Sequence, residues 1–439
     1  MNDDLPALRR VRWLAAALAE PSGVEVEDIE RAYDVSRWSG DWSYERELEF
    51  FRDGRHAPSR PLTVERESSA GPDEATVVLS GADGKSWTVT CWVEPDDLHR
   101  IVRARVLPTP PEGLEIRLAV ADDAEALGAL ERRAPIRLGH DPITFMSFDH
   151  GDDYFAPGRL MNEVTIYIAE VEGEVAGAYC GAVQPVHLDG EAKRLFLEHH
   201  VRIDPATRRG AVFWALCDYG RDRYAQATDS IAFYVSVDNL AVRKFVEGVP
   251  PWSVQPLRAL LRCPDPADAE PLVDGVEPAT AADAEDIAAF LNECHDQAAL
   301  YVPYTGSSIS ERLSRDPDQY GWTQMRRTVG AAVGVSDQLV RVIHSREGTE
   351  RHSVRALALD HGFRPGCEDE YRALLRSWCR ELGGRGATHL AVFTSERSST
   401  FSVLSDLADD IEVFDFWAFE LDEPASLASH GFYVDAIYF

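Results

Sequence analysis

Positive charge is scarce in this chain of 439 residues. Its 44 lysines and arginines are outnumbered by 75 aspartates and glutamates, which gives a formal net charge of −31. The electric field of this negative charge repels polyanions. The composition therefore argues against binding of nucleic acid through its phosphates and against binding to an anionic membrane surface. We therefore expect no nucleic-acid partner and no membrane partner.

Cysteine and long apolar runs are scarce too. The chain has seven cysteines, an odd number, and no two of them have CxxC spacing. This argues against a disulfide framework and against a thiolate zinc site. The apolar stretch Trp13–Ala19 is too short for a signal peptide or a membrane span. With 45% apolar and 27% charged residues, the composition is that of a folded protein, which we expect in the cytoplasm.

Two proline-rich stretches, residues 107–113 and 263–271, interrupt the chain. They predict three domains of overall class α+β. We expect an α+β domain over residues 1–110, and two mixed-sheet α/β domains over residues 114–263 and 275–439.

The first domain changes character along its length. Leu5 to Leu18 have helical spacing, and residues 42–51 predict a second short helix. Four stretches then have strand composition: Thr63–Arg66, Ala75–Leu79, Trp87–Val93 and Ile101–Leu107. Helices followed by a curved antiparallel sheet resemble the cone-shaped nuclear-transport-factor-like domains, which implies a unit that holds a ligand or mediates association.

The second and third domains repeat one order of elements. Each opens with a short strand and a helix rich in Asp and Ala, and each continues with strands, a helix, a strand, a helix and a final strand pattern, which indicates duplication. In the middle domain, residues 164–183 predict a hairpin and Ala192–Ile203 a third strand. A helix to about Tyr224, a strand over 230–237 and a short helix over 239–247 follow.

The third strand of the middle domain runs directly into a basic turn, Asp204-Pro-Ala-Thr-Arg-Arg-Gly-Ala-Val-Phe213, that opens a helix. The first N–H groups of a helix have no intrahelical partner, and the helix dipole adds positive charge there, so such a turn suits a phosphate. Five arginines and three aspartates lie from Arg202 to Arg223, a local surplus of two positive charges. The sequence therefore predicts an anionic ligand at this turn.

These residues resemble the GNAT acetyltransferase superfamily, whose acyl-CoA turn has the pattern Arg/Gln-x-x-Gly-x-Gly/Ala. Arg208 matches the leading position, while Ala211 and Phe213 stand where small residues are expected. Asn239 matches the Asn of the family's later helix, and Phe245 falls near its usual Tyr. The resemblance implies a GNAT fold in both halves, and acetyl-CoA or another acyl-CoA as the acyl donor.

The resemblance also implies which residues bind CoA. Val201 and Ile203, on the strand before the turn, would pair with the pantetheine arm. The diphosphate would be surrounded by the turn and first helical residues, with Asn239 nearby: Arg208, Arg209, Gly210, Ala211, Val212 and Phe213.

Direct attack of an amine on the thioester needs a base and an acid. Glu198 and His200 are the candidate bases, and strict strand alternation would place both on one face. Because Phe245 cannot donate a proton, Tyr234 is our candidate acid, with Tyr219 and Tyr224 as alternatives. Each of these residues also has an ordinary explanation, as a solubilising strand residue or a packing aromatic.

The acceptor is expected at the helix–loop stretch of residues 136–162, whose aromatic and acidic side chains suit a cationic amine. The spacing of its His and Asp residues matches no compact metal motif, so we expect no metal. In the third domain, Glu368, Asp369 and Glu370 at a helix start would repel a diphosphate. That half is therefore expected to be structural or to wall the acceptor site, with residues 431–439 forming a strand built into a sheet.

The sequence thus predicts an acyl-CoA-dependent N-acyltransferase acting on a small amine-bearing molecule. The alternative is a catalytically weak acyl-CoA-binding or scaffold protein with degenerate GNAT domains. Transfer from an aminoacyl-tRNA fits poorly with the charge of −31. Self-association as a homodimer is compatible with either function.

Overall fold

The computed structural model describes residues 6–20, 25, 28, 32, 62–69, 73–81, 86–93, 101–139, 142–151, 153–207, 209–224, 227–246, 251–264, 276–419 and 421–436. The chain forms two compact units. One comprises Met1–Leu114 with Arg208–Ala215, and the other comprises Glu115–Thr207 with Leu216–Phe439. The helix predicted over residues 42–51 lies outside the described residues.

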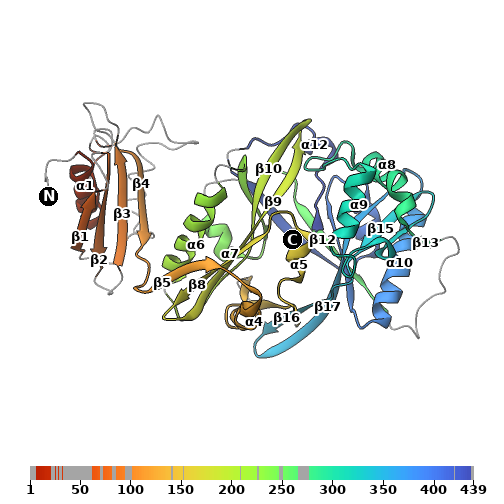
Figure 1. Ribbon diagram of the computed structural model, residues 1–439, viewed down its shortest axis with the longest axis horizontal. Coiled ribbons are helices and arrows are strands. Elements are labelled where there is room, and N and C mark those ends of the chain that lie inside the picture. Colours follow the sequence, from red (N-terminus) through yellow and green to blue (C-terminus); the bar gives the residue numbers. More distant parts are fainter. Residues whose placement is uncertain are drawn as a thin grey trace. The chain divides into compact units, whose positions relative to one another are not determined.

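In the described part of the N-terminal segment of the first unit, helix α1 packs on an antiparallel sheet (Figure 1). The sheet has strand order β1-β2-β3-β4. Leu8, Val11 and Leu14 share the apolar face of the helix and pack on alternate residues of β2 and β3, such as Val77 and Val89. The elements are α1 (Pro6–Ala19), β1 (Thr63–Ser69), β2 (Glu74–Ser80), β3 (Ser86–Val93) and β4 (Ile101–Pro108).

The two halves predicted from the repeated element order lie in the second unit, except for Leu114 and residues 209–215, which belong to the first. The first half consists of β5 (Leu114–Leu118), α4 (Ala124–Arg133), β6 (Ile136–Leu138), β7 (Thr144–Asp149), α5 (Ala156–Leu160), β8 (Thr165–Val171), β9 (Glu174–Leu188), β10 (Glu191–Ile203), α6 (Arg209–Tyr224), β11 (Ser230–Ser236), α7 (Leu240–Phe245) and β12 (Pro256–Arg262). The stretch expected as a helix and loop before β8 forms two strands, β6 and β7, before the short helix α5.

The second half repeats this order with two differences: its described residues form no strands between its first two α-helices, and one strand is added before the strand that leads into its longest helix. It consists of β13 (Glu277–Pro278), α8 (Ala284–His295), α9 (Gly306–Arg315), β14 (Met325–Arg327), β15 (Ala331–Val335), β16 (Val340–Arg346), β17 (Thr349–Phe363), α10 (Glu368–Gly384), β18 (His389–Ser395), α11 (Thr400–Leu407), β19 (Asp410–Ala418) and α12 (Leu427–His430). β16 pairs with β17 and also with β7 of the first half.

One sheet runs through both halves, in the order β13-β14-β15-β17-β18-β12-β19-β11-β10-β9-β8-β5. β12, the last strand of the first half, lies between β18 and β19 of the second half. β19 in turn pairs with β11 of the first half. The sequence places a domain boundary between the halves, but each half contributes its final strand to the other, and the sheet continues across that boundary.

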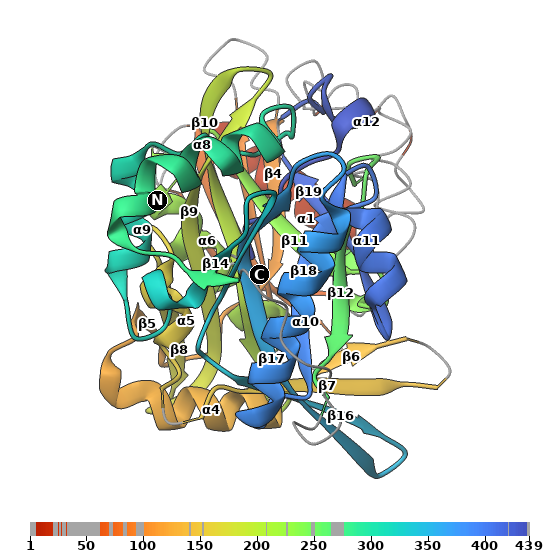
Figure 2. The ribbon, with the colours of Figure 1, turned by 90° about the vertical axis from the view of Figure 1, so that its right-hand side faces the viewer.

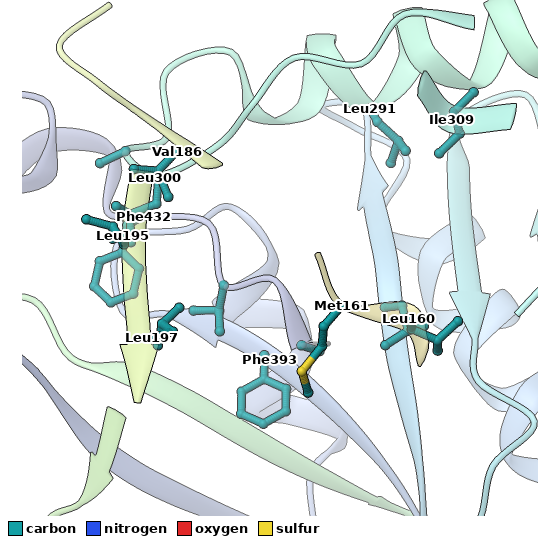
Figure 3. Close-up of a cluster of buried hydrophobic side chains, with 14 of the residues drawn as sticks. Leu160, Met161, Val186, Leu195, Leu197, Leu291, Leu300, Ile309, Phe393 and Phe432 are labelled. Carbon is teal, nitrogen blue, oxygen red and sulfur yellow. The ribbon is translucent and has the colours of Figure 1, made fainter. Parts of the chain in front are cut away.

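Apolar side chains from both halves form a common core on one face of this sheet. Figure 3 shows Leu195 and Leu197 of β10 in the same cluster as Leu291 of α8, Ile309 of α9 and Phe393 of β18. All five side chains are nearly or fully buried. The two halves are therefore held together by a shared core as well as by strand pairing.

Helices cover the opposite face. α10 runs along β17 and β18 (Figure 2). Its side chains Leu374 and Trp378 are buried on the side that packs against the sheet. In the first half, the C-terminal part of α6 packs on β10, where Tyr224 stacks on Phe196 with ring centroids 4.2 Å apart. This two-sided cover places β10 and β11 in the middle of the fold.

The strand predicted at the C-terminus is wrong for the residues the structure describes. Phe432 makes a single bridge to Ala299, and residues 433–436 form no strand. The segment is nevertheless buried, because Phe432 and Val434 pack into the common core. Its apolar composition predicted burial correctly and secondary structure incorrectly.

Candidate active site

β10 and β11 start as paired parallel strands and then separate. Their register runs only from Leu195 opposite Ser230 to Leu197 opposite Ala232. Beyond this point β11 pairs with β19, and β10 continues to Ile203 with β9 on its other edge. Within the described chain, the β11-facing edge of β10 past Leu197 therefore has no strand partner, and a strand edge of this kind can pair with a ligand that carries amides. One backbone group of this segment already has a partner, because the Val201 carbonyl accepts a hydrogen bond from Arg202 Nη1.

The end of β10 is irregular at the same place. The register with β9 shifts between His199 and Arg202, and His200 has a φ of +48°. A bulge of this kind changes the direction of side chains along a strand. The prediction that Glu198 and His200 share one face by alternation is wrong for this reason, because alternation ends at the bulge.

Glu198 and His200 have different surroundings. Glu198 accepts a hydrogen bond of 2.7 Å from the hydroxyl of Tyr179, whose ring lies 6.2 Å from Phe196 on the α6 side of the sheet. The His200 ring instead lies 5.6 Å from Phe148 and 5.7 Å from His150, both from the β7 region. The acceptor stretch predicted from sequence thus contributes residues beside His200, not beside Glu198.

Three histidines gather at the bulge. The Nδ1 atoms of His199 and His200 are 2.9 Å apart, within hydrogen-bonding distance. Burial lowers the pKa of His199 to about 4, and burial followed by the charge of Arg202 lowers that of His150 to about 4. Burial, His199, His150 and Arg202 together keep the pKa of His200 well below its usual value. All three rings are therefore neutral at pH 7, with nitrogen lone pairs available.

A buried ion pair lies beneath these rings. Arg202 is 5% exposed and its Nε donates to Glu131 Oε2 of α4 at 2.7 Å, while its Nη1 donates to the Val201 carbonyl at 2.9 Å. Arg202 was counted in the positive surplus expected at the turn, and the structure corrects this, because its charge is neutralised inside the core. Sequence analysis missed Glu131, although a glutamate among Leu127, Leu130 and Ala134 on an apolar helix face is a detectable signal.

The turn after β10 offers fewer free backbone amides to an anion than the sequence predicted. Asp204 Oδ1 accepts from the Ala206 amide at 2.8 Å, and the Asp204 carbonyl accepts from the Thr207 amide at 3.1 Å. Two turn amides are thus already bonded, and the first turn of α6 remains as the candidate anion site. That turn contains no acidic residue, whereas α10 of the second half begins with Glu368, Asp369 and Glu370.

The predicted diphosphate residues lie at the start of α6. Gly210, Ala211 and Val212 are in its first turn, and the side chains of Ala211 and Val212 are buried. Phe213 is half-buried beside Trp214. Arg208 and the side chain of Arg209 lie outside the described residues. Ile203, predicted to contact pantetheine, ends β10 and pairs with Gly177 of β9.

The remaining predicted residues have structural partners. Tyr234 lies on β11 with its ring 4.8 Å from Phe416, and burial raises its pKa, which makes its hydroxyl a weaker acid. Asn239 precedes α7, and its Oδ1 accepts from the Val242 amide at 3.4 Å as a helix cap. Neither observation tests a role in catalysis or CoA binding.

Within the described residues, no group of three or more His, Cys, Asp and Glu side chains is placed to hold a metal ion. None of the helices described is long and apolar enough to cross a membrane. His140, Asp141 and Asp152 of the predicted acceptor stretch fall outside the described residues.

Comparison with known proteins identifies the fold. No family model and no curated protein matches the sequence. Two structures of Saccharomyces cerevisiae N-myristoyltransferase with bound myristoyl-CoA match with TM-scores of 0.52 at 10% and 11% identity, covering 72% of this chain and 82% of theirs. The chain has the GNAT fold.

This confirms the predicted fold class and the GNAT resemblance at the level of the fold. A GCN5-related N-acetyltransferase from Sphaerobacter thermophilus also matches, with a TM-score of 0.43 and 14% identity over 72% of this chain and 99% of that one. At such identities the similarity concerns the fold and not the reaction. The activity of this GNAT-fold chain must be argued from its own residues.

Proposed function

We propose that the protein is an acyl-CoA-dependent N-acyltransferase that acts on a small amine-bearing molecule. The observation that supports this best is the separation of β10 and β11 after Leu197 and Ala232, which leaves one edge of β10 without a strand partner in the described chain. The pantetheine arm of CoA carries amide groups along an extended chain, and an open strand edge binds such a group as it would bind another strand.

The donor would lie along the end of β10. Backbone groups near Val201 and Ile203 would pair with pantetheine, and the diphosphate would meet the first N–H groups of α6, from Arg209 to Phe213, with Arg208 and Arg209 supplying charge. Acetyl-CoA is the donor we propose first.

The chemistry is direct transfer. The amine nitrogen attacks the thioester carbonyl, the C–N bond forms as the C–S bond breaks, and one proton passes from the amine nitrogen to the departing sulfur. Glu198 and His200 are the proposed bases, each within the segment of β10 that lacks β11 as a partner. Tyr234 is the proposed acid, and its raised pKa makes it a weak proton donor.

The turn after β10 favours a second function, that of a catalytically weak acyl-CoA-binding or scaffold protein. Asp204 already satisfies the amides of Ala206 and Thr207, and Arg202 is neutralised by Glu131. Both reduce the positive field available to a diphosphate, as in a protein that binds acyl-CoA weakly and without reaction. The acidic start of α10 makes CoA binding by the second half unfavourable in either case.

Calorimetry with acetyl-CoA and with longer acyl-CoA molecules, combined with thiol-release assays over a panel of small amines, tests the proposal. We expect binding with amine-dependent thiol release. Binding without thiol release would favour the scaffold function, and no binding would exclude both.

The double variant Arg208→Ala/Arg209→Ala tests the position of the diphosphate. We expect weaker CoA binding and an almost unchanged melting temperature. The matched control Arg346→Ala/Arg351→Ala removes the same charge from exposed positions on the β16–β17 hairpin and should leave CoA binding unchanged. Equal affinity of the first variant and the natural chain would refute the assignment.

A further inference from the structure

The hydrogen bond between His199 and His200 restricts the protons of both rings. Both rings are neutral at pH 7, so each carries one N–H. A bond between the two Nδ1 atoms, 2.9 Å apart, needs one hydrogen between them, donated by one ring and accepted by the other. The donating ring then has a lone pair at Nε2, and the accepting ring has its hydrogen at Nε2. The two tautomers are therefore coupled.

Nothing described around the pair fixes one of these two arrangements. Nε2 of His199 is shielded from water and has no hydrogen-bond partner among the described residues, whether it is a donor or an acceptor. Both rings belong to half-buried residues, and the backbone of His200 has a positive φ at the bulge. A proton can therefore move across the Nδ1–Nδ1 bond in either direction, and His200 is the ring of the pair that lies beside Phe148 and His150 of the predicted acceptor stretch.

The groups that face the pair disfavour a permanent positive charge. From the β7 region these are His150 and, behind it, Tyr154, whose ring centroid lies 5.2 Å from that of His150. From β10 it is Arg202, paired with Glu131 of α4. From β9 it is Cys180, which is opposite His199 in the register, and burial raises its thiol pKa to about 12.

We propose that His199 and His200 act as one proton-holding unit in acyl transfer, with His200 exchanging the proton with the reactants and His199 setting its tautomer. This rests on the proposed function. When His200 donates through Nδ1, its Nε2 lone pair takes the proton of the attacking amine, and the extra charge is shared with His199 across the bond. The same proton then passes to the departing sulfur, and both rings return to neutrality. His199 is in this scheme a positioning residue.

The histidine pair supplies the proton donor that the sequence lacks at Phe245, where the family usually has a Tyr. A single base that takes the amine proton and returns it to the thiolate makes a separate tyrosine acid unnecessary. The balance is complete, because one proton leaves nitrogen, one proton arrives at sulfur, and the histidine pair is unchanged at the end.

Nitrogen-15 NMR of the histidine rings in the full-length protein tests the pair without any substrate. His199→Phe and His200→Phe identify the two signals. We expect both rings to be neutral at pH 6 and to share one proton at Nδ1, with the signal of His200 shifting in the His199 variants. Two rings that both carry their hydrogen at Nε2, or a His200 that titrates near its ordinary pKa, would overturn the proposal.

Turnover tests the catalytic part. His200→Phe should lower kcat within the range of about 10²–10⁴-fold typical of general acid–base groups, with KM for acyl-CoA unchanged. His199→Phe should lower kcat and move the acidic limb of the pH profile, while His199→Asn, whose amide can accept from His200 Nδ1, should restore part of the rate. An unchanged pH profile in His199→Phe would reduce His199 to a packing residue and refute its role.

His352→Asn, on the exposed β16–β17 hairpin, is the control and should leave rate and pH profile unchanged. If the natural chain releases no thiol with any amine, the proposed function fails and the catalytic role falls with it. The NMR experiment still decides whether the coupled pair exists, so the two failures are distinguishable.

Discussion

At the scale of the residue, corresponding bulges in the two halves hold different side chains. In the first half the bulge of β10 carries His199 and His200. In the second half the register of β15 with β17 shifts beside Asp360, which is fully buried. Asp360 accepts hydrogen bonds from Arg312 Nε at 2.8 Å and from the Tyr320 hydroxyl at 2.7 Å. Burial opposes its ionisation, but Arg312 and the hydroxyls of Tyr320 and Tyr304 hold its pKa below the usual value. The bulge of the second half therefore holds a buried carboxylate whose hydrogen-bond partners come from the protein itself, which is a structural role.

The neighbouring His361 predicts how stability depends on pH. Burial lowers its pKa from 6.5 to about 4. Between these values the unfolded chain binds a proton that the folded chain does not, so the free energy of unfolding should fall as the pH is lowered from 6.5 to about 4. His361→Gln removes the titration and retains a donor for the Phe393 carbonyl, which lies 2.9 Å from Nε2.

Urea denaturation at pH 7 and pH 5 measures this effect. We expect the variant to lose less stability between the two pH values than the natural chain does. Equal losses would show that His361 does not contribute to the acid sensitivity of the fold.

At the scale of the element, the β9–β10 pair carries the site and depends on close contact between its side chains. Gly181 is opposite Glu198 in the register. A Cβ at this glycine would lie 2.2 Å from Cζ of the buried Phe196. Phe196 in turn stacks on Tyr224 of α6, so the ring has little room to move. The absence of a side chain at position 181 is what allows Phe196 to cover the strand pair.

Gly181→Ala should therefore destabilise the protein by about 1–3 kcal/mol, the usual cost of overpacking a core. Thermal and urea denaturation measure it. The control is Gly128→Ala in α4, where the nearest atom to a new Cβ is Arg132 Nη1 at 3.7 Å. This control should stabilise the chain by about 0.5–1 kcal/mol through helix propensity. A Gly181→Ala variant as stable as the natural chain would contradict the packing argument.

At the scale of the whole molecule, strand exchange joins the two halves of the second unit. β12 leaves the first half to pair with β18, and β19 leaves the second half to pair with β11. The pair β12–β19 connects these exchanges in the middle of the sheet. The common core adds apolar contacts between the halves, such as Leu197 with the cluster that contains Phe393. Neither half has a complete sheet of its own.

A protease site inserted between residues 265 and 275 tests this arrangement. After cleavage, the two fragments should elute together in size-exclusion chromatography under native conditions and separate only in denaturant, because each supplies a strand to the other. An uncleaved sample and a sample cleaved after unfolding are the controls. Separation of the fragments in native buffer would show that the halves are independent domains.

The sequence alone determined the order of elements from β8 to α7 and the resemblance to the GNAT fold, but not the strands β6 and β7. The strand that ends at Ile203, the helix that follows it and the acidic start of α10 at Glu368 were all predicted close to their observed bounds. Such features depend on periodicity, turn residues and helix-end charge, which act over a few neighbouring positions. Local rules also predicted the burial of the C-terminal segment.

Only the tertiary structure decided how the side chains around β10 are arranged. The bulge at His200, the ion pair of Glu131 with Arg202 and the exchange of β12 and β19 join residues far apart in the chain. A strand pattern assumes regular alternation, so it placed Glu198 and His200 together, and the register with β9 separated them. Backbone pairing and burial are set by distant partners, and this is why the sequence could name the candidate residues but not their arrangement.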